Sequence, residues 1–113
     1  MNKRKAADVY PFIEAFIARK EEQIGEIEQV IERYEKKRMI EERSYQSMST
    51  LRRMFTGRKP DHHLAVEYIH YVKKPMEQIR QLRAEIEHAR LILSESQPGD
   101  LVAVSEELEK EIK

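Results

Sequence analysis

One turn divides this chain into two long segments of helical periodicity. Gly57 is well placed to end a helix in the left-handed conformation, and Pro60 cannot continue that helix because it lacks a backbone N–H. Asp61 then offers a carboxylate that can cap the next helix. On both sides of the turn, apolar residues return at intervals of three and four, the period of an α-helix. The sequence therefore predicts an all-α fold built on a long, coiled-coil-like antiparallel helical hairpin.

The first arm is predicted as one helix over residues 9–56. Asp8 is placed to cap its first turn, and Pro11 falls within that turn, where a missing N–H costs nothing. Residues 35–50 combine a charged run with three serines and a threonine, whose side chains compete for backbone hydrogen bonds. We therefore expect a kink or a break between residues 36 and 48. Beyond it the apolar stripe resumes with Tyr45, Met48, Leu51 and Phe55.

The second arm is predicted as a helix over residues 62–95 with a heptad-like apolar seam. Pro75 interrupts that seam, and a proline so deep in a helix removes a hydrogen bond and bends the helix by steric clash. A kink is therefore expected between Val72 and Pro75. The seam consists of Ala65, Tyr68, Val72, Ile79, Leu82, Ile86, Ala89 and Leu93.

A short third helix is predicted over residues 101–112. Residues 96–100 contain Pro98 and Gly99 and indicate a turn, and Asp100 is placed as the cap of the helix that follows. A helix of this length is not stable without packing on something else. With only 113 residues to distribute, we expect residues 1–113 to form one helical domain.

The two arms of the hairpin differ in length. Folding the chain about position 59 places residue 95 against residue 23, so residues 9–22 extend beyond the second arm. Each buried aromatic or branched side chain there contributes about 1.5–3 kcal/mol, so this stretch must be covered. The third helix, a second copy of the chain and a different partner are the three open alternatives. The expected assembly is a homodimeric helical bundle.

The residues expected to carry association share an apolar character and a helical spacing. The N-terminal set either contacts a partner or is covered by the C-terminal set, which otherwise joins the same interface. The two sets are Val9, Phe12, Ile13, Phe16 and Ile17, and Leu101, Val104, Leu108 and Ile112.

Composition limits the chemistry and the cellular location that we expect for the protein. The chain has no cysteine, which excludes disulfides, thiolate metal sites and cysteine catalysis. No stretch approaches the roughly 20 apolar residues of a membrane span, and the basic first residues are not followed by the unbroken apolar run of a signal peptide. We therefore expect a soluble, cytoplasmic protein that does not associate with a membrane.

Charge is balanced overall but distributed unevenly. Residues 36–63 carry eight Lys/Arg and three Asp/Glu, whereas residues 85–113 carry three and eight, so the two blocks can attract one another within or between chains. The basic residues at the hairpin turn are candidate anion contacts and suggest nucleic-acid binding as a second alternative function. No aromatic platform is interleaved with them, so this alternative ranks low. The candidates are Arg52, Arg53, Arg58 and Lys59.

One candidate metal site consists of His63, Glu67 and His70, which lie four and three residues apart and share a helix face. A Glu-x-x-His pair is the local unit of carboxylate-bridged metal sites in helical bundles. However, the two histidines lie nearly opposite the predicted seam, and such a site needs ligands that face inward. We therefore predict neither a metal nor another cofactor.

Catalysis has no support in the residue pattern. The serines belong to helix interiors or turns, and none lies in a Gly-x-Ser-x-Gly elbow or a similar motif. The sequence therefore predicts a protein without enzymatic activity. Its expected function is that of a protein–protein interaction or regulatory module that acts as a homo-oligomer or binds another helical protein.

The run Ser105-Glu106-Glu107-Leu108-Glu109 carries one family resemblance. With the helical pattern that precedes it from Ile79, it resembles the small aspartyl-phosphate phosphatases of the Bacillus sporulation phosphorelay, two-helix hairpins with a Ser-Gln-Glu-Leu-Asp signature. The first, third and fourth residues match, and glutamates stand in place of the family's glutamine and aspartate. The family has no counterpart to residues 1–75. The resemblance implies, as an alternative function, a small phosphorelay regulator.

Overall fold

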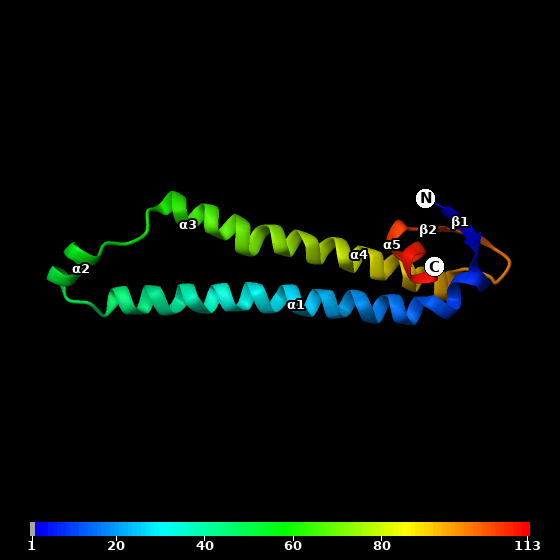
Figure 1. Ribbon diagram of the computed structural model, residues 1–113, viewed down its shortest axis with the longest axis horizontal. Helices are drawn as coiled ribbons and strands as arrows, with labels where there is room; N and C mark the ends of the chain where they lie inside the picture. Colours follow the sequence, from blue (N-terminus) through cyan, green and yellow to red (C-terminus); the bar gives the residue numbers. More distant parts are fainter. Residues whose placement is uncertain (1) are drawn as a thin grey trace. The chain divides into compact units, whose positions relative to one another are not determined.

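The computed structural model describes residues 2–113 and is mostly helical, at 80% of the chain. The predicted hairpin is confirmed, since the long helix α1 packs antiparallel against α4 (Figure 1). A short helix also lies near the C-terminus, as expected. In chain order the elements are β1 (Asn2–Lys5), α1 (Ala6–Gln46), α2 (Thr50–Thr56), α3 (Asp61–Tyr68), the π-helix η1 (Ile69–Lys73), α4 (Lys74–Glu95), β2 (Leu101–Val104) and α5 (Glu106–Ile112).

Contacts divide the chain into two compact units. Unit 1 consists of the residues up to Gly25 together with Ile79–Lys113, and unit 2 is Glu26–Gln78. Helix α1 contributes residues to both units. Whether the units unfold together as the expected single domain stays a prediction.

A pair of strands in unit 1 corrects the prediction of a third helix over residues 101–112. Residues 101–104 form β2, which pairs antiparallel with β1 so that Asn2 lies opposite Val104 and Lys5 opposite Leu101. The local sequence Leu-Val-Ala-Val favours a strand because its valines are β-branched. Helix α5 therefore begins only after Ser105, whose hydroxyl accepts the hydrogen bond from the Leu108 N–H at 3.2 Å.

Helix α1 begins earlier than predicted and for a different reason. Asp8 is not its cap, because the helix starts at Ala6, directly after β1. The N–H groups of Ala6 and Ala7 donate to the carbonyls of Asp100 and Pro98 at 2.8 and 3.0 Å. Asp100, expected to cap the third helix, instead accepts a hydrogen bond from the Gln97 N–H within the turn. The turn that precedes β2 thus supplies the acceptors that a capping side chain would otherwise provide.

Unit 1 covers the apolar stretch of the first arm, residues 9–22, that was expected to extend beyond the second arm. Of the three alternatives considered, the chain's own C-terminal segment fills the position, since β2 and α5 supply Val104 and Leu108 to the cluster. Ile92 belongs to it in place of the predicted Leu93, which is exposed. The cluster consists of Val9, Ile13, Phe16, Ala89, Ile92, Val104 and Leu108, with Tyr10, Ile17, Val102 and Ile112 packed against it.

Ion pairs also close unit 1. Arg4 on β1 binds the carboxylate of Glu109 on α5 through two hydrogen bonds from its Nε, at 2.9 and 3.0 Å, and one from its Nη2. Lys20 is only 4% exposed, and its Nζ lies 3.2 Å from Glu107 and 3.6 Å from Glu85. Carboxylates of the acidic block at residues 85–113 are thus neutralised by cations of the same unit.

The first arm is broken in two, so the prediction of one helix over residues 9–56 is wrong at residues 47–49. The charged run stays helical, and α1 ends only at Gln46. Ser49 caps α2 by accepting a hydrogen bond from the Arg52 N–H. The guanidinium of Arg53 donates to the carbonyls of Tyr45 and Gln46, which end α1 without helical partners. Serine chemistry therefore places the break at the C-terminal end of the expected range and one residue beyond it.

Near Pro75, where a kink is expected, the structure has the π-helix η1. Its five residues end two positions before the proline. Pro75 has no N–H for the carbonyl of Tyr71, four residues back. The Lys74 N–H donates to the carbonyl of Ile69, five residues back, so the helix accommodates the proline by taking in one extra residue.

This extra residue changes which face of the second arm turns inward in unit 2. One added residue rotates the preceding segment by about 100° around the helix axis. The predicted seam residues Ala65 and Tyr68 are exposed as a result, whereas Leu64 and Glu67 are partly buried. Glu67, which the sequence pattern places on a solvent face, thereby points toward α1.

Candidate interaction surface

Apolar side chains are distributed very differently in the two units. Among the buried apolar residues of the described chain, Val72 alone lies in unit 2. Among the exposed large apolar residues, only Leu91, Leu93 and Leu101 lie outside unit 2. Exposed large apolar groups mark interaction sites when they gather in one region, so unit 2 contains the candidate interaction surface. Its members are Val30, Met39, Ile40, Leu51, Met54, Phe55, Val66, Tyr68, Ile69, Tyr71 and Met76.

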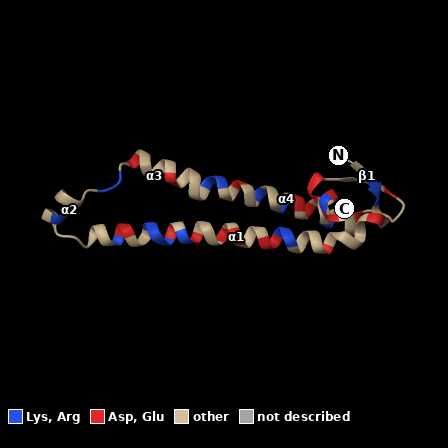
Figure 2. Cartoon of the chain, in the orientation of Figure 1, with Lys and Arg blue, Asp and Glu red and all other residues tan. Residues whose placement is uncertain are grey.

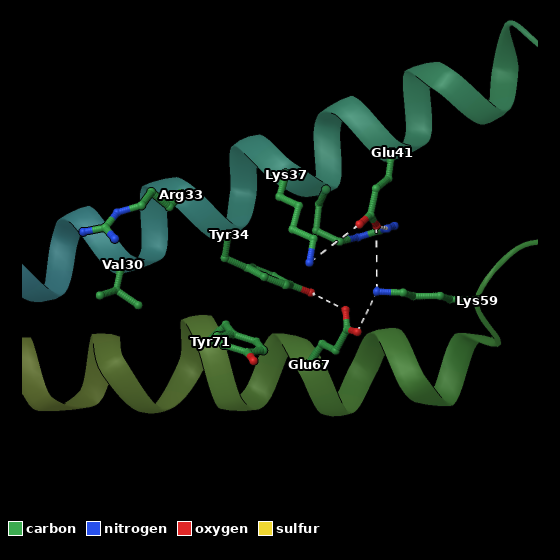
Figure 3. Close-up of a pocket in the computed structure, with 9 residues that line it drawn as sticks. Val30, Arg33, Tyr34, Lys37, Glu41, Lys59, Glu67 and Tyr71 are labelled. Carbon is green, nitrogen blue, oxygen red and sulfur yellow. Dashed lines mark hydrogen bonds and ion pairs between the residues drawn. The ribbon is translucent and has the colours of Figure 1, made fainter.

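A polar network holds the helices of unit 2 together (Figure 3). The hydroxyl of Tyr34 on α1 donates to Glu67 Oε2 on α3 at 3.2 Å, and Lys59 Nζ donates to Glu67 Oε1 at 2.8 Å. The rings of Tyr34 and Tyr71 stack with their centroids 4.9 Å apart and their planes inclined by 15°. The network therefore joins α1, the turn and the second arm with one carboxylate at its centre.

A second set of ion pairs anchors the turn to α1. Lys59 Nζ also lies 3.9 Å from Glu41, whose carboxylate accepts a hydrogen bond from Arg38 at 2.8 Å. Arg58 pairs with Glu42 at 2.5 Å. The residues after α2 are thus held against the end of the first arm by side chains rather than by an apolar core.

The electrostatics of the network keep its groups in their ordinary charge states at neutral pH. The hydrogen bond from Lys59 lowers the pKa of Glu67, and the same bond raises the pKa of Lys59. Burial raises the pKa of Tyr34, and its hydrogen bond to Glu67 adds to that effect. Glu67 is therefore a fixed acceptor, whereas a general base at neutral pH needs a pKa near 7.

An open pocket of about 300 Å³ lies over this network. Its wall combines the stacked tyrosines with charged groups that already pair with one another, and no serine, threonine or histidine faces it. It is lined by Val30, Arg33, Tyr34, Lys37, Arg38, Glu41, Lys59, Glu67 and Tyr71.

The metal set considered from the sequence does not converge. Glu67 is bound to Tyr34 and Lys59, whereas the His63 ring contacts His62 edge to face at 4.4 Å between centroids. The His70 ring contacts Tyr71 in the same manner at 4.7 Å. Within residues 2–113, no group of three or more potential ligands is placed to hold a metal ion.

Three of the four candidate anion contacts already have partners within unit 2. Arg53 donates to backbone carbonyls, Arg58 pairs with Glu42, and Lys59 pairs with Glu67. Arg52 is exposed. The four cations thus do not form one cluster directed at an anion.

Helix α2 carries three of the most exposed apolar side chains of the described chain. Leu51, Met54 and Phe55 are 65%, 76% and 83% exposed, and they share one helix face because they lie at positions i, i+3 and i+4. We call these residues the α2 triad. The sequence pattern placed Leu51 and Phe55 in the buried stripe of the first arm, and this is wrong because the break at residues 47–49 separates α2 from that helix.

The expected association residues lie in unit 1 and contact one another. Val9, Ile13 and Phe16 are buried, and Phe12 is half-buried. Leu101 is exposed at 68% and lies outside the cluster. The apolar stretch that pointed to a partner is thus covered within the chain, and the exposed apolar surface lies elsewhere.

The run that resembles the phosphatase signature is built into unit 1. Ser105 caps α5, Glu107 pairs with Lys20 and Lys110, and Leu108 is in the core. The Lys110 and Lys20 hydrogen bonds lower the pKa of Glu107. These positions therefore have structural roles that account for their residue types.

Comparison with protein-family models, curated proteins and solved structures finds no match for this chain. None of the helices formed by residues 2–113 combines the length and apolar character that crossing a bilayer requires.

Proposed function

We propose that this protein is a non-enzymatic helical interaction module that forms a homodimer through unit 2. The observation that carries the proposal is the exposure of eleven large apolar side chains in a unit that buries only Val72. Apolar surface removed from water contributes about 25 cal/mol per Å², so a unit with this surface gains by association.

The architecture of unit 2 favours another helical hairpin as the covering partner. In a pair of antiparallel helices, each helix is covered by its neighbour on one face only. Four-helix bundles cover more of the apolar surface by packing a second pair of helices on the first. A second copy of the chain brings an identical surface, and a two-fold interface pairs such surfaces reciprocally. This supports a homodimer over a partner of different fold.

Residues on the second arm provide the most direct contact candidates. Val66 is 62% exposed, and Ile69, three residues later, shares its side of the helix. On α1, Met39 and Ile40 add further exposed apolar groups. These four residues belong to the helical body of unit 2 and are separate from the α2 triad.

The absence of enzymatic activity is also part of the proposal. Ser49 and Ser105 cap helices, Ser96 contacts Tyr10 and the carbonyl of Ile92, and Glu67 is held by Lys59. These four side chains are thus engaged in structural hydrogen bonds, which favours a binding role.

Sedimentation equilibrium tests the proposal. The wild-type protein is expected to sediment as a dimer, and the double variant Val66→Asp/Ile69→Asp as a monomer with unchanged helical circular dichroism. Leu91→Asp/Leu93→Asp is the matched control, because these leucines are exposed to a similar degree in unit 1, and it should stay dimeric. A wild-type monomer at all concentrations, or a dimer that survives the Val66/Ile69 change, would refute the proposal.

A further inference from the structure

The α2 triad lies in a segment of unusual charge. Residues 43–60 contain five Lys/Arg and no Asp/Glu. Figure 2 shows basic but no acidic residues on α2 and in the turn that follows it. Three strongly exposed apolar side chains therefore coincide, at the closed end of the unit 2 hairpin, with a segment whose charged residues are all basic (Figure 1).

We propose that α2 docks on an anionic lipid bilayer and inserts Leu51, Met54 and Phe55 into its headgroup region. Short helices with leucine and phenylalanine on one face and basic residues on the other bind the interface of anionic membranes in this way. The inserted side chains supply apolar burial, and Arg52 and Arg43, both exposed, face the lipid phosphates. This goes beyond the proposed homodimer, which uses the helical body of unit 2.

The charge of the segment disfavours the other occupants. Two copies of the α2 triad would bring two basic segments together, and like charges repel. A protein groove that binds a helix reads anchors over i, i+3, i+4 and i+7, and α2 has only seven residues, so it ends before the last anchor. A bilayer requires no such complementarity, because each inserted side chain contributes its burial separately.

Basic side chains remain in excess at the α2 end of unit 2 after the ion pairs are taken into account. Arg58 and Lys59 are neutralised by Glu42 and Glu67, and Arg53 donates to backbone carbonyls without meeting a carboxylate. Arg43, Arg52 and Arg53 are not among the ion-paired residues of the described chain, so their charges form the surplus. Each basic residue near an anionic surface strengthens binding in a salt-dependent manner.

Helix α2 is also held in its folded form before any contact with lipid. Ser49 caps its first turn, and Gly57, with φ of 72°, closes its last turn by donating its N–H to the carbonyl of Arg53. The guanidinium of Arg53 fastens α2 to the end of α1 and lies over the Tyr45 ring at 5.5 Å. A seven-residue helix is unstable by itself, so these contacts remove an ordering cost that a free peptide would meet on binding.

The absence of tryptophan from the chain permits a site-specific test. Phe55→Trp places a single indole on the α2 triad, and Leu91→Trp places one on an exposed position of unit 1 as the matched control. With phosphatidylserine/phosphatidylcholine vesicles, the emission of Phe55→Trp should shift to shorter wavelength, and that of Leu91→Trp should not. Pure phosphatidylcholine vesicles and inorganic phosphate should cause no shift.

Vesicle co-sedimentation provides the quantitative measurement. Met54→Ser/Phe55→Ser should weaken binding to the anionic vesicles at least about tenfold, because two apolar side chains no longer insert. Arg52→Gln should weaken it less and reduce its dependence on salt. Helical circular dichroism confirms that the variants fold, and repeating the measurement in the Val66→Asp/Ile69→Asp background separates lipid binding from dimerisation.

Three results would overturn this inference. The first is an unshifted Phe55→Trp spectrum with anionic vesicles. The second is equal vesicle binding by wild type and Met54→Ser/Phe55→Ser, which would assign the binding to charge alone. The third is an equal spectral shift with poly-glutamate or RNA in place of vesicles, which would assign α2 to an acidic protein or to nucleic acid.

Discussion

Unit 1 and unit 2 share the helix α1, yet they achieve stability in different ways. Unit 1 surrounds its part of α1 with α4, β2 and α5 and closes a cluster of seven buried side chains. Unit 2 pairs its part with the second arm through a tyrosine stack and a carboxylate network. The same type of helix is thus covered in one unit and left with an open apolar surface in the other.

This difference shows which part of the chain leaves apolar side chains uncovered. The long apolar stretch at the start of α1 indicates a missing partner when judged from sequence, but β2 and α5 cover it within the chain. The mixed pattern of residues 26–78 indicates nothing comparable, and yet this is where apolar side chains meet water. Exposure in the folded chain, rather than hydrophobicity in the sequence, therefore marks the candidate interaction surface.

The largest expected effect is a difference in unfolding free energy between alanine substitutions at two phenylalanines, one in each unit. Phe16 is 1% exposed in unit 1 and Phe55 is 83% exposed in unit 2. Phe16→Ala should lower the free energy of unfolding by about 3–5 kcal/mol because it leaves a cavity in the core. Phe55→Ala should change it by less than about 0.5 kcal/mol. Urea denaturation measures both, and equal losses would contradict the contrast between the units.

A smaller effect is expected for two lysines. Lys20→Met retains the packing stem but leaves Glu85 and Glu107 without their shared cation, and it should cost about 1–3 kcal/mol. Lys37 lies 4.0 Å from Glu41 with 70% of its side chain exposed, so Lys37→Met should cost less than about 0.5 kcal/mol. If Lys20→Met leaves the urea midpoint unchanged, the buried ion pairs do not help to close unit 1.

The smallest expected effect is a loss of folding stability at acidic pH. Hydrogen bonds from Arg4 lower the pKa of Glu109 below its ordinary value. The unfolded chain then binds more protons than the folded one, so this stabilisation is present above the unfolded pKa of about 4.3 and is lost as pH falls through the lower folded value.

The Glu109→Gln variant checks this linkage. It should flatten the decline of urea stability below about pH 4.5, since the replaced group no longer titrates. Glu67→Gln in unit 2 should act in the same direction but more weakly, because the partner Lys59 is more exposed than Arg4 and water screens the pair. A wild-type curve that is reproduced by Glu109→Gln at every pH would contradict the assignment.

The sequence predicts those features of the fold that depend on local chemistry. Gly57, Pro60 and Asp61 mark the turn, and the three- and four-residue spacing marks the arms. The strand pair escapes the prediction because β1 and β2 are separated by almost the whole chain, and a periodic pattern has no information about a distant partner. The sequence therefore predicts a helix for the four apolar residues of β2.

The candidate site is harder to predict for a related reason. Pro75 signals a disturbance, but the sequence does not reveal that one residue is added to the helix before it. That single residue turns Glu67 inward and Tyr68 outward, so both the network and the exposed surface differ from the predicted seam. The sequence shows that the charged residues of segment 43–60 are all basic. Only the structure shows that the same segment exposes the apolar α2 triad.

Residue-resolved amide hydrogen exchange tests most directly whether unit 1 is closed by itself and unit 2 by a second copy. In the wild-type protein, the amides of α1 up to Gly25 and those of α3 should both be protected. In Val66→Asp/Ile69→Asp, the unit 1 amides should keep their protection, and the α3 amides should exchange much faster. Equal protection of α3 in the two proteins, or loss of protection throughout unit 1 in the variant, would contradict this account.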